Sequence, residues 1–165
     1  MKRRSVARAK WSWSALALVC ALAACTQAVE RKWSDGTRRG EGRQSTFTRA
    51  EEGLWTYWFP NGELREQGRY LHGRRVGSWR QWYPNGSPRS AGQREWNPTA
   101  GGSLREGVWT FWHENGVLAA HGAFEQGLRE GQWDYNLDSG ALDGNQSGEY
   151  HRDQRIDWAA SRERR

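Results

Sequence analysis

The sequence predicts an all-β fold, an elongated antiparallel meander of stacked β-hairpin repeats. Two observations support this prediction: a motif recurs four times, and aromatic side chains alternate along each copy. The copies align without gaps over ten residues, at Gly53–Gly62, Gly77–Gly86, Gly107–Gly116 and Gly131–Gly140. Recurrence at a short, nearly fixed spacing is typical of repeat proteins, in which each unit packs mainly on its neighbours.

The spacing of the copies indicates how the chain is divided. Their starts lie 24, 30 and 24 residues apart, and the six additional residues fall in Trp96–Gly102, whose Gly and Pro content predicts an inserted loop. A degenerate half-unit containing Trp33 and Gly42 precedes the first copy. The expected organisation is a lipoprotein signal peptide over 1–24, an N-terminal linker with a degenerate half-repeat over 25–52, four hairpin repeats over 53–150 and a charged C-terminal tail over 151–165.

Each copy is expected to form one hairpin around its Asn-Gly pair. Asn-Gly supplies the positive φ angles that a tight two-residue loop requires, and the flanking residues alternate and carry aromatics. With Asn61-Gly62 as the loop, Phe59 is placed opposite Leu64.

The same register sets a Trp of each of the first three copies against a Gly of its own hairpin. A large ring that faces a glycine suggests that the ring lies across the bare backbone. In the fourth copy Trp133 would face Gln146, which indicates a longer turn there. The three Trp–Gly pairs are Trp55 with Gly68, Trp79 with Gly92, and Trp109 with Gly122.

Alternation divides the residues between two faces of the predicted sheet. The core face is expected to carry the first Trp of each copy, the aromatic residues that follow it, and Leu64 and Leu118. The second face carries a ladder of Trp side chains with a spacing of about 10 Å, because equivalent positions lie two strands apart. Since a single meander has nothing obvious to cover this face, we hypothesise a binding stripe made by Trp58, Trp82 and Trp112 with Arg65 and Arg89. The alternative is that the three rings form a second packed layer, covered by Arg65, Arg89 and neighbouring loops.

The charge of the chain argues against nucleic acid as a partner. The net charge is +6, but residues 1–24 contribute five basic side chains and no acidic one. The remainder, with 20 basic and 19 acidic residues, is close to neutral, and nucleic-acid-binding domains are usually strongly basic. The remainder also carries ten Trp, whereas disordered chains are poor in aromatic residues, so we expect a folded domain.

The N-terminal segment has the pattern of a secretory signal. A basic start is followed by an apolar stretch over 11–22, which is too short to span a membrane as a helix. Leu22-Ala23-Ala24-Cys25 resembles a lipobox, which implies cleavage after Ala24 and lipidation of the Cys25 thiol. Two or three acyl chains hold a protein firmly on a membrane. Since an Asp after the lipidated Cys tends to retain lipoproteins in the inner membrane, Thr26 favours the outer membrane.

The repeat unit resembles a known family. Gly-x-Trp-x-x-aromatic-x-x-Asn-Gly-x-Leu, followed by Gly and an aromatic residue as in Gly68 and Tyr70, is similar to the variant MORN repeat, which also marks proteins labelled YwqK-type antitoxins. The resemblance covers roughly residues 53–150 and implies an elongated meander of hairpins. Two departures are Pro88, where other units have Leu, and Arg94, where other units have an aromatic residue.

No arrangement of residues indicates catalysis, and no cofactor or metal is expected. The four His are scattered and lack a metal-binding spacing such as His-x-His. His113 falls on the aromatic face, where a packed or rim histidine is the better interpretation. Glu63, Glu66, Glu114 and Glu125 could be imagined as an acid/base pair, but most lie at loop flanks, where solvated carboxylates are usual.

These observations favour a non-enzymatic scaffold that is lipid-anchored in the cell envelope and binds an unidentified partner protein. One alternative is binding of a carbohydrate or cell-wall glycan through the Trp ladder, because aromatic rings are good platforms for sugars. Another is a periplasmic antitoxin or immunity-like role, which rests on the family label alone.

The first test concerns the anchor. Replacing Cys25 by Ser removes the thiol that would carry the lipid, so membrane fractionation should be lost and uncleaved or soluble protein should accumulate. The matched control is Cys20→Ser, which should change little. A Cys25→Ser protein that still bears lipid would contradict the assignment.

Overall fold

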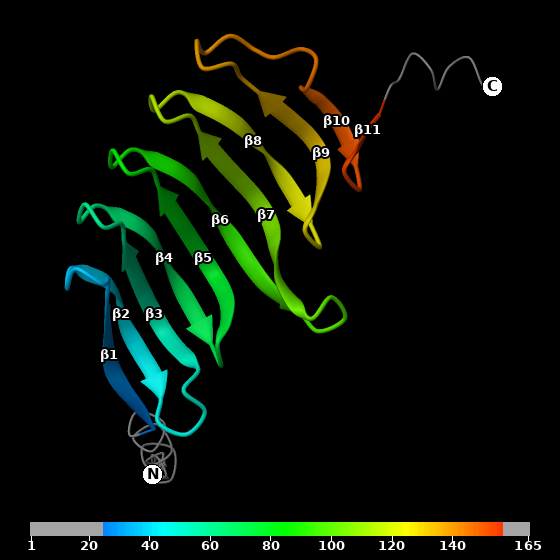
Figure 1. Ribbon diagram of the computed structural model, residues 1–165. Helices are drawn as coiled ribbons and strands as arrows, with labels where there is room; N and C mark the ends of the chain where they lie inside the picture. Colours follow the sequence, from blue (N-terminus) through cyan, green and yellow to red (C-terminus); the bar gives the residue numbers. More distant parts are fainter. Residues whose placement is uncertain (1–24, 157–165) are drawn as a thin grey trace, which may run out of the picture.

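The computed structural model describes residues 25–156, and these form a single open sheet of antiparallel strands joined in sequence order. In Figure 1 the hairpins follow one another along the long axis of the molecule, with β1 and β11 at opposite ends. The expected meander of stacked hairpins is therefore confirmed. The strands are β1 (Thr26–Lys32), β2 (Arg38–Ser45), β3 (Glu51–Trp58), β4 (Leu64–Leu71), β5 (Arg74–Trp82), β6 (Pro88–Asn97), β7 (Gly102–Trp112), β8 (Leu118–Glu125), β9 (Leu128–Tyr135), β10 (Gly148–His151) and β11 (Gln154–Arg155).

Several expectations concern the ends of the chain. The signal peptide over 1–24 and the tail beyond residue 156 lie outside the described residues. Within 25–156 no helix is both long and apolar enough to cross a membrane. The segment expected to hold only half a unit contains a complete hairpin, β1–β2, which pairs with the first repeat through β2 and β3.

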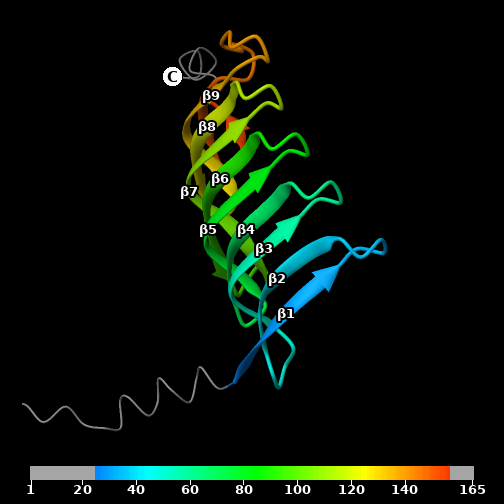
Figure 2. The same ribbon diagram turned by 90° about the vertical axis from the view of Figure 1, so that its left-hand side faces the viewer.

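The Asn-Gly turns differ from the expected two-residue loops. The Gly62 N–H donates to the Phe59 carbonyl, and the Phe59 N–H donates to the Glu63 carbonyl, which encloses a three-residue loop. Only Gly62 has a positive φ (87°) in this loop. Asn61 instead accepts the Glu63 N–H through its side chain and donates to the Pro84 carbonyl of the next turn. The row of turns visible in Figure 2 is therefore bonded from one unit to the next.

The glycine that begins each Gly-x-Trp motif lies at a β-bulge. Gly77 and Ser78 fall between the paired residues Val76 and Trp79, whereas the partner strand runs directly from Arg69 to Gly68. Gly77 has a φ of 67°, a conformation in which a Cβ atom is strained. The bulge turns the strand so that the following Trp reaches back over the preceding strand. The equivalent glycines Gly53, Gly107 and Gly131 also have positive φ.

Each buried Trp lies across a glycine, but not the one that was expected. The register sets Trp55 against Gly68, as predicted, yet the ring covering Gly68 belongs to Trp79 of the next hairpin. A Cβ atom on Gly68 would overlap that ring. Most of these indoles also donate Nε1–H to the backbone of the strand that they cover, as Trp109 does to the Gln93 carbonyl at 2.9 Å. The ring–glycine pairs are Trp55 on Gly42, Trp79 on Gly68, Trp109 on Gly92 and Trp133 on Gly122.

Arginine side chains lie on the other side of these rings. The Arg75 guanidinium is 4.5 Å from the Trp79 ring centroid, and Arg105 is 5.1 Å from that of Trp109. Such contacts contribute about 0.5–1 kcal/mol each where they are partly exposed. In the first repeat Glu51 takes the place of the arginine, and its ion-pair partner Arg31 (2.8 Å) covers Trp55 instead. The sheet thus buries Trp55, Trp79 and Trp109 between glycine backbone and guanidinium groups, whereas the equivalent Arg129 lies over Tyr150 and not over Trp133.

Two details of the repeats depart from a regular stack. The fourth repeat has the longer turn that was expected, since Trp133 pairs with Gly148 and not with Gln146. The insertion expected to be a loop mainly lengthens two strands, because Trp96 pairs with Ser103 and Asn97 with Gly102.

Because the Trp rings lie against glycine backbone, a single methyl group added at one of these glycines should strongly lower the free energy of unfolding. Gly92→Ala would push a Cβ into the Trp109 ring, so the free energy of unfolding should fall by about 3 kcal/mol, the upper end for overpacking. Gly102→Ala is the matched control, because a Cβ at Gly102 meets open space. Urea unfolding measures both. Similar costs for the two variants would contradict the packing described.

Candidate interaction surface

The predicted stripe residues Trp58, Trp82 and Trp112 all lie near the Asn-Gly turns, at the ends of β3, β5 and β7. All three are half-buried, in contrast to Trp109, which is 2% exposed. Each is paired with an apolar residue on the other strand of its hairpin: Trp58 with Leu64, Trp82 with Pro88, and Trp112 with Leu118. We call these six residues the Trp row.

The Trp row is more continuous than the predicted ladder of separate rings. Leu64 and Leu118 were expected on the core face, and that expectation is wrong because each hairpin contains a bulge beside its second-face Trp. Tyr57 pairs with Glu66 and Trp58 with Leu64, so Arg65 is an extra residue and Leu64 moves to the second face. The strands that carry Leu64 and Pro88 therefore fill the intervals between successive Trp-bearing strands.

The bulge also displaces the two arginines assigned to the stripe. The Arg65 guanidinium lies 5.5 Å from the Tyr57 ring centroid, and so on the core side. Arg89 lies 5.7 Å from the ring of Tyr83. The structure therefore brings the three Trp together on one face and places Arg65 and Arg89 over other rings. Strand alternation alone missed this, because a one-residue bulge reverses the face of every residue between it and the turn.

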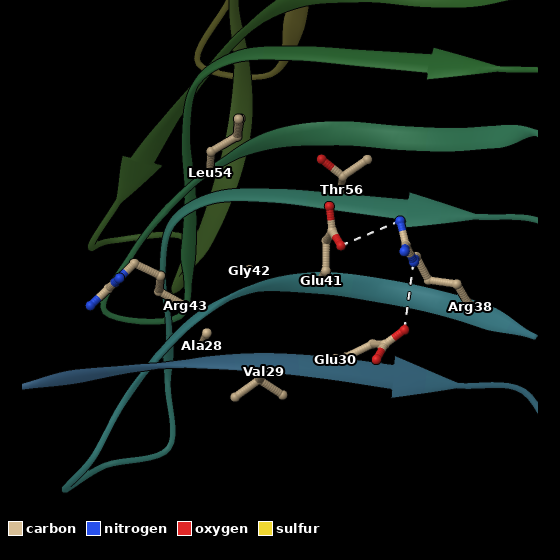
Figure 3. Close-up of a pocket in the computed structure, with 9 residues that line it drawn as sticks. All are labelled: Ala28, Val29, Glu30, Arg38, Glu41, Gly42, Arg43, Leu54 and Thr56. Atoms are coloured by element: carbon tan, nitrogen blue, oxygen red, sulfur yellow. Dashed lines mark ion pairs between the residues drawn. The ribbon is translucent and has the colours of Figure 1, made fainter.

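The first ring of the row is covered by an arginine that sequence reasoning did not single out. The Arg38 guanidinium lies 5.0 Å from the Trp58 ring centroid and 3.5 Å from both Glu30 and Glu41. Figure 3 shows Arg38 held between these two carboxylates beside a hollow of about 540 Å³, with Leu54 and Thr56 across it. The β1–β2 hairpin thus closes one end of the Trp row with charged side chains.

The other end of the Trp row is open. Leu118 is 38% exposed, and Leu142, which pairs with Asn136 in place of a fourth Trp–Leu pair, is 61% exposed. Leu54 and Val108, each more than half exposed, lie further along β3 and β7. Exposed apolar side chains commonly mark a site of interaction where they form one patch.

The acidic residues considered for catalysis are not brought together. Glu66 is buried, and its carboxylate lies 3.3 Å from Arg65 and 3.2 Å from Arg75. Glu63, Glu114 and Glu125 are exposed residues at or near turns. A carboxylate held between two arginines stabilises the aromatic face and is not arranged as a proton donor.

The histidines have local partners. His72 and His151 contact Glu52 and Glu130, at 2.8 and 2.9 Å. His113 Nε2 is 2.8 Å from the Asn136 carbonyl of the next repeat, which agrees with a packed histidine. Across residues 25–156, no group of three or more His, Cys, Asp or Glu has the geometry of a metal site.

The geometry defines a class of protein: a linear repeat scaffold in which hairpins stack through aromatic rings. Three segments, 51–72, 75–94 and 105–126, match the family described as MORN repeat variant. They correspond to hairpins β3–β4, β5–β6 and β7–β8. Three of the four copies that the sequence motif predicted are therefore similar to the variant MORN repeat.

The other comparisons are uninformative about function. No curated protein sequence matches the chain. A chain from a solved structure, "Crystal structure of GtfA/B complex bound to UDP and GlcNAc", is similar over 67% of this protein and 20% of its own length, with 13% identity and a TM-score of 0.23. This protein thus spans one fifth of that chain, and a likeness at this score carries no functional argument.

The two Trp positions of one strand should differ in their effect on stability. Trp109→Thr removes a ring between Gly92 and Arg105 and should cost about 3–5 kcal/mol. Trp112→Thr, three residues along β7, removes a half-buried ring and should cost about 1–2 kcal/mol, because part of its surface already faces water. Denaturant unfolding compares them. Equal costs would show that Trp112 is a core residue.

Proposed function

We propose that the protein is a non-enzymatic scaffold, held in the cell envelope by lipid on Cys25, that binds a partner protein along the Trp row. The observation that carries the proposal is the row itself, in which half-buried indoles alternate with Leu and Pro on a sheet face that no second layer formed by residues 25–156 covers. Protein-binding surfaces commonly use Trp in this way, because a few large rings supply most of the binding energy.

The alternation of side chains favours a protein over a glycan. A sugar stacks on one flat, accessible ring, and successive sugars need separate rings. Here Leu64, Pro88 and Leu118 fill the intervals and give a ridged apolar surface, which suits apolar side chains of another protein. Arg38, Glu30 and Glu41 at the closed end supply a charged rim of the kind that borders protein interfaces.

The position of β1 supports a lipid anchor that is attached to the sheet without intervening linker residues. β1 begins at Thr26, directly after Cys25, and the Cys25 carbonyl accepts the Thr46 N–H at 2.9 Å. Lipid on Cys25 would therefore attach the first hairpin closely to a membrane surface. Thr26 after the lipidated residue favours the outer membrane.

Crosslinking in the native host tests the partner. A photoreactive amino acid at Thr110, on β7 beside Trp112, should capture a protein from the full-length anchored scaffold. The double variant Trp82→Thr, Trp112→Thr should reduce that capture by at least about tenfold, as expected when interface residues of the dominant kind are removed. The matched control is Phe47→Thr, which removes an 81% exposed ring in the β2–β3 loop, away from the Trp row.

The crosslinking results distinguish the proposed protein-binding surface from the carbohydrate alternative. Capture that survives in the double variant, whose fold is checked by circular dichroism, would show that the Trp row is not the binding surface. Capture of a glycan and no protein would favour the carbohydrate alternative.

A further inference from the structure

One position of the aromatic face breaks the repeat pattern with a charge. The residue two after the glycine that pairs with the buried Trp of its own hairpin is Tyr70, Phe124 or Tyr150 in three repeats, but Arg94 in the second. Tyr70 and Phe124 make edge contacts with the next Trp, at centroid distances of 5.2 and 4.9 Å. Arg94 puts a cation in that place, 5.6 Å from the Trp109 ring centroid.

A second cation shares the same ring. Arg105 pairs with Arg94 directly across β6 and β7, and its guanidinium is 5.1 Å from the Trp109 centroid. The inner side of that ring lies against Gly92, so both guanidinium groups occupy its outer side. Like charges placed directly opposite each other across a sheet destabilise it.

Among the described residues, no carboxylate forms an ion pair with either of these two arginines, although the charge of Glu66 opposes the lowering of the Arg94 pKa. The nearby acid, Glu66, is ion-paired with Arg65 and Arg75, and neither Arg94 nor Arg105 takes part in an ion pair. The Arg94 Nη1 donates to the Ser103 carbonyl, whereas the buried Arg105 Nε has no partner in the described structure. Burial, together with the charges of Arg75 and Arg105, lowers the pKa of Arg94, and burial lowers that of Arg105.

We propose that Arg94 and Arg105 form an oxyanion-binding site over Trp109, which takes a phosphate or carboxylate group from solution. Two guanidinium groups offer several N–H donors in planar forks, which match the oxygens of such groups. The bound anion would supply the negative charge that the repeat lacks. This site lies on the opposite face from the Trp row and does not depend on the proposed partner.

The full-length protein in a neutral detergent provides the test. Its Tm is measured against sodium phosphate, with sodium chloride at equal ionic strength as the reference. A ligand that binds only the folded state raises Tm by an amount that grows with the logarithm of its concentration above Kd, here by about 4 °C at ten times its Kd. A parallel titration with sodium acetate distinguishes the two sources, since a carboxylate site responds to acetate and a site selective for phosphate does not.

Three variants locate the effect. Arg94→Phe restores the ring of the other repeats, and Arg94→Gln removes the charge without adding bulk, so both should lose the shift in Tm with anion concentration while remaining folded. Arg80→Gln is the matched control, because it removes the same charge from β5 on the opposite face, and it should keep the shift. A wild-type protein that responds to neither phosphate nor acetate more than to chloride would overturn the proposal. A shift that persists in both Arg94 variants would also overturn it.

Discussion

Each buried indole of this protein lies flat on a glycine that belongs to the hairpin before it in the chain. A sheet with one layer has no opposing sheet to cover its aromatic residues, so the rings must use the backbone itself as the surface on which they are buried. The glycines leave that surface bare, the bulge at Gly77 and its equivalents directs the indole onto it, and arginines such as Arg75 cover the outer side. Without the bare glycine none of the other contacts forms.

The sequence predicted the hairpins and the pairing of Trp with Gly in the first three copies, because these follow from local turn residues and from alternation. It did not predict which ring covers which glycine. Gly68 is paired with Trp55 on one side and with Trp79 on the other, and the motif does not distinguish the two. The sequence also did not predict the role of Asn61. Its side chain donates a hydrogen bond to the next turn, 23 residues away, and no local pattern reveals such a contact.

The sequence predicted only the part of the candidate surface that follows from strand alternation. The positions of Trp58, Trp82 and Trp112 on one face follow from alternation. The contribution of Leu64, Pro88 and Leu118 does not, because it depends on a bulge that adds Arg65 to one strand only. The Arg94–Arg105 pair is visible in the sequence as a departure from the motif at Arg94, but the pairing of the two residues required the register across the insertion between β6 and β7.

Because each buried indole packs on the hairpin that precedes it in the chain, the stack of hairpins has a direction. A hairpin at the C-terminal end can be removed and leaves behind only an uncovered glycine, whereas loss of the first hairpin strips the support from Trp55. The β1–β2 hairpin is thus a template: it offers Gly42 but has no buried indole of its own to place. Such a chain is suited to vectorial assembly. Each hairpin that emerges finds its docking surface already formed by the one before it, in the order in which the chain is synthesised.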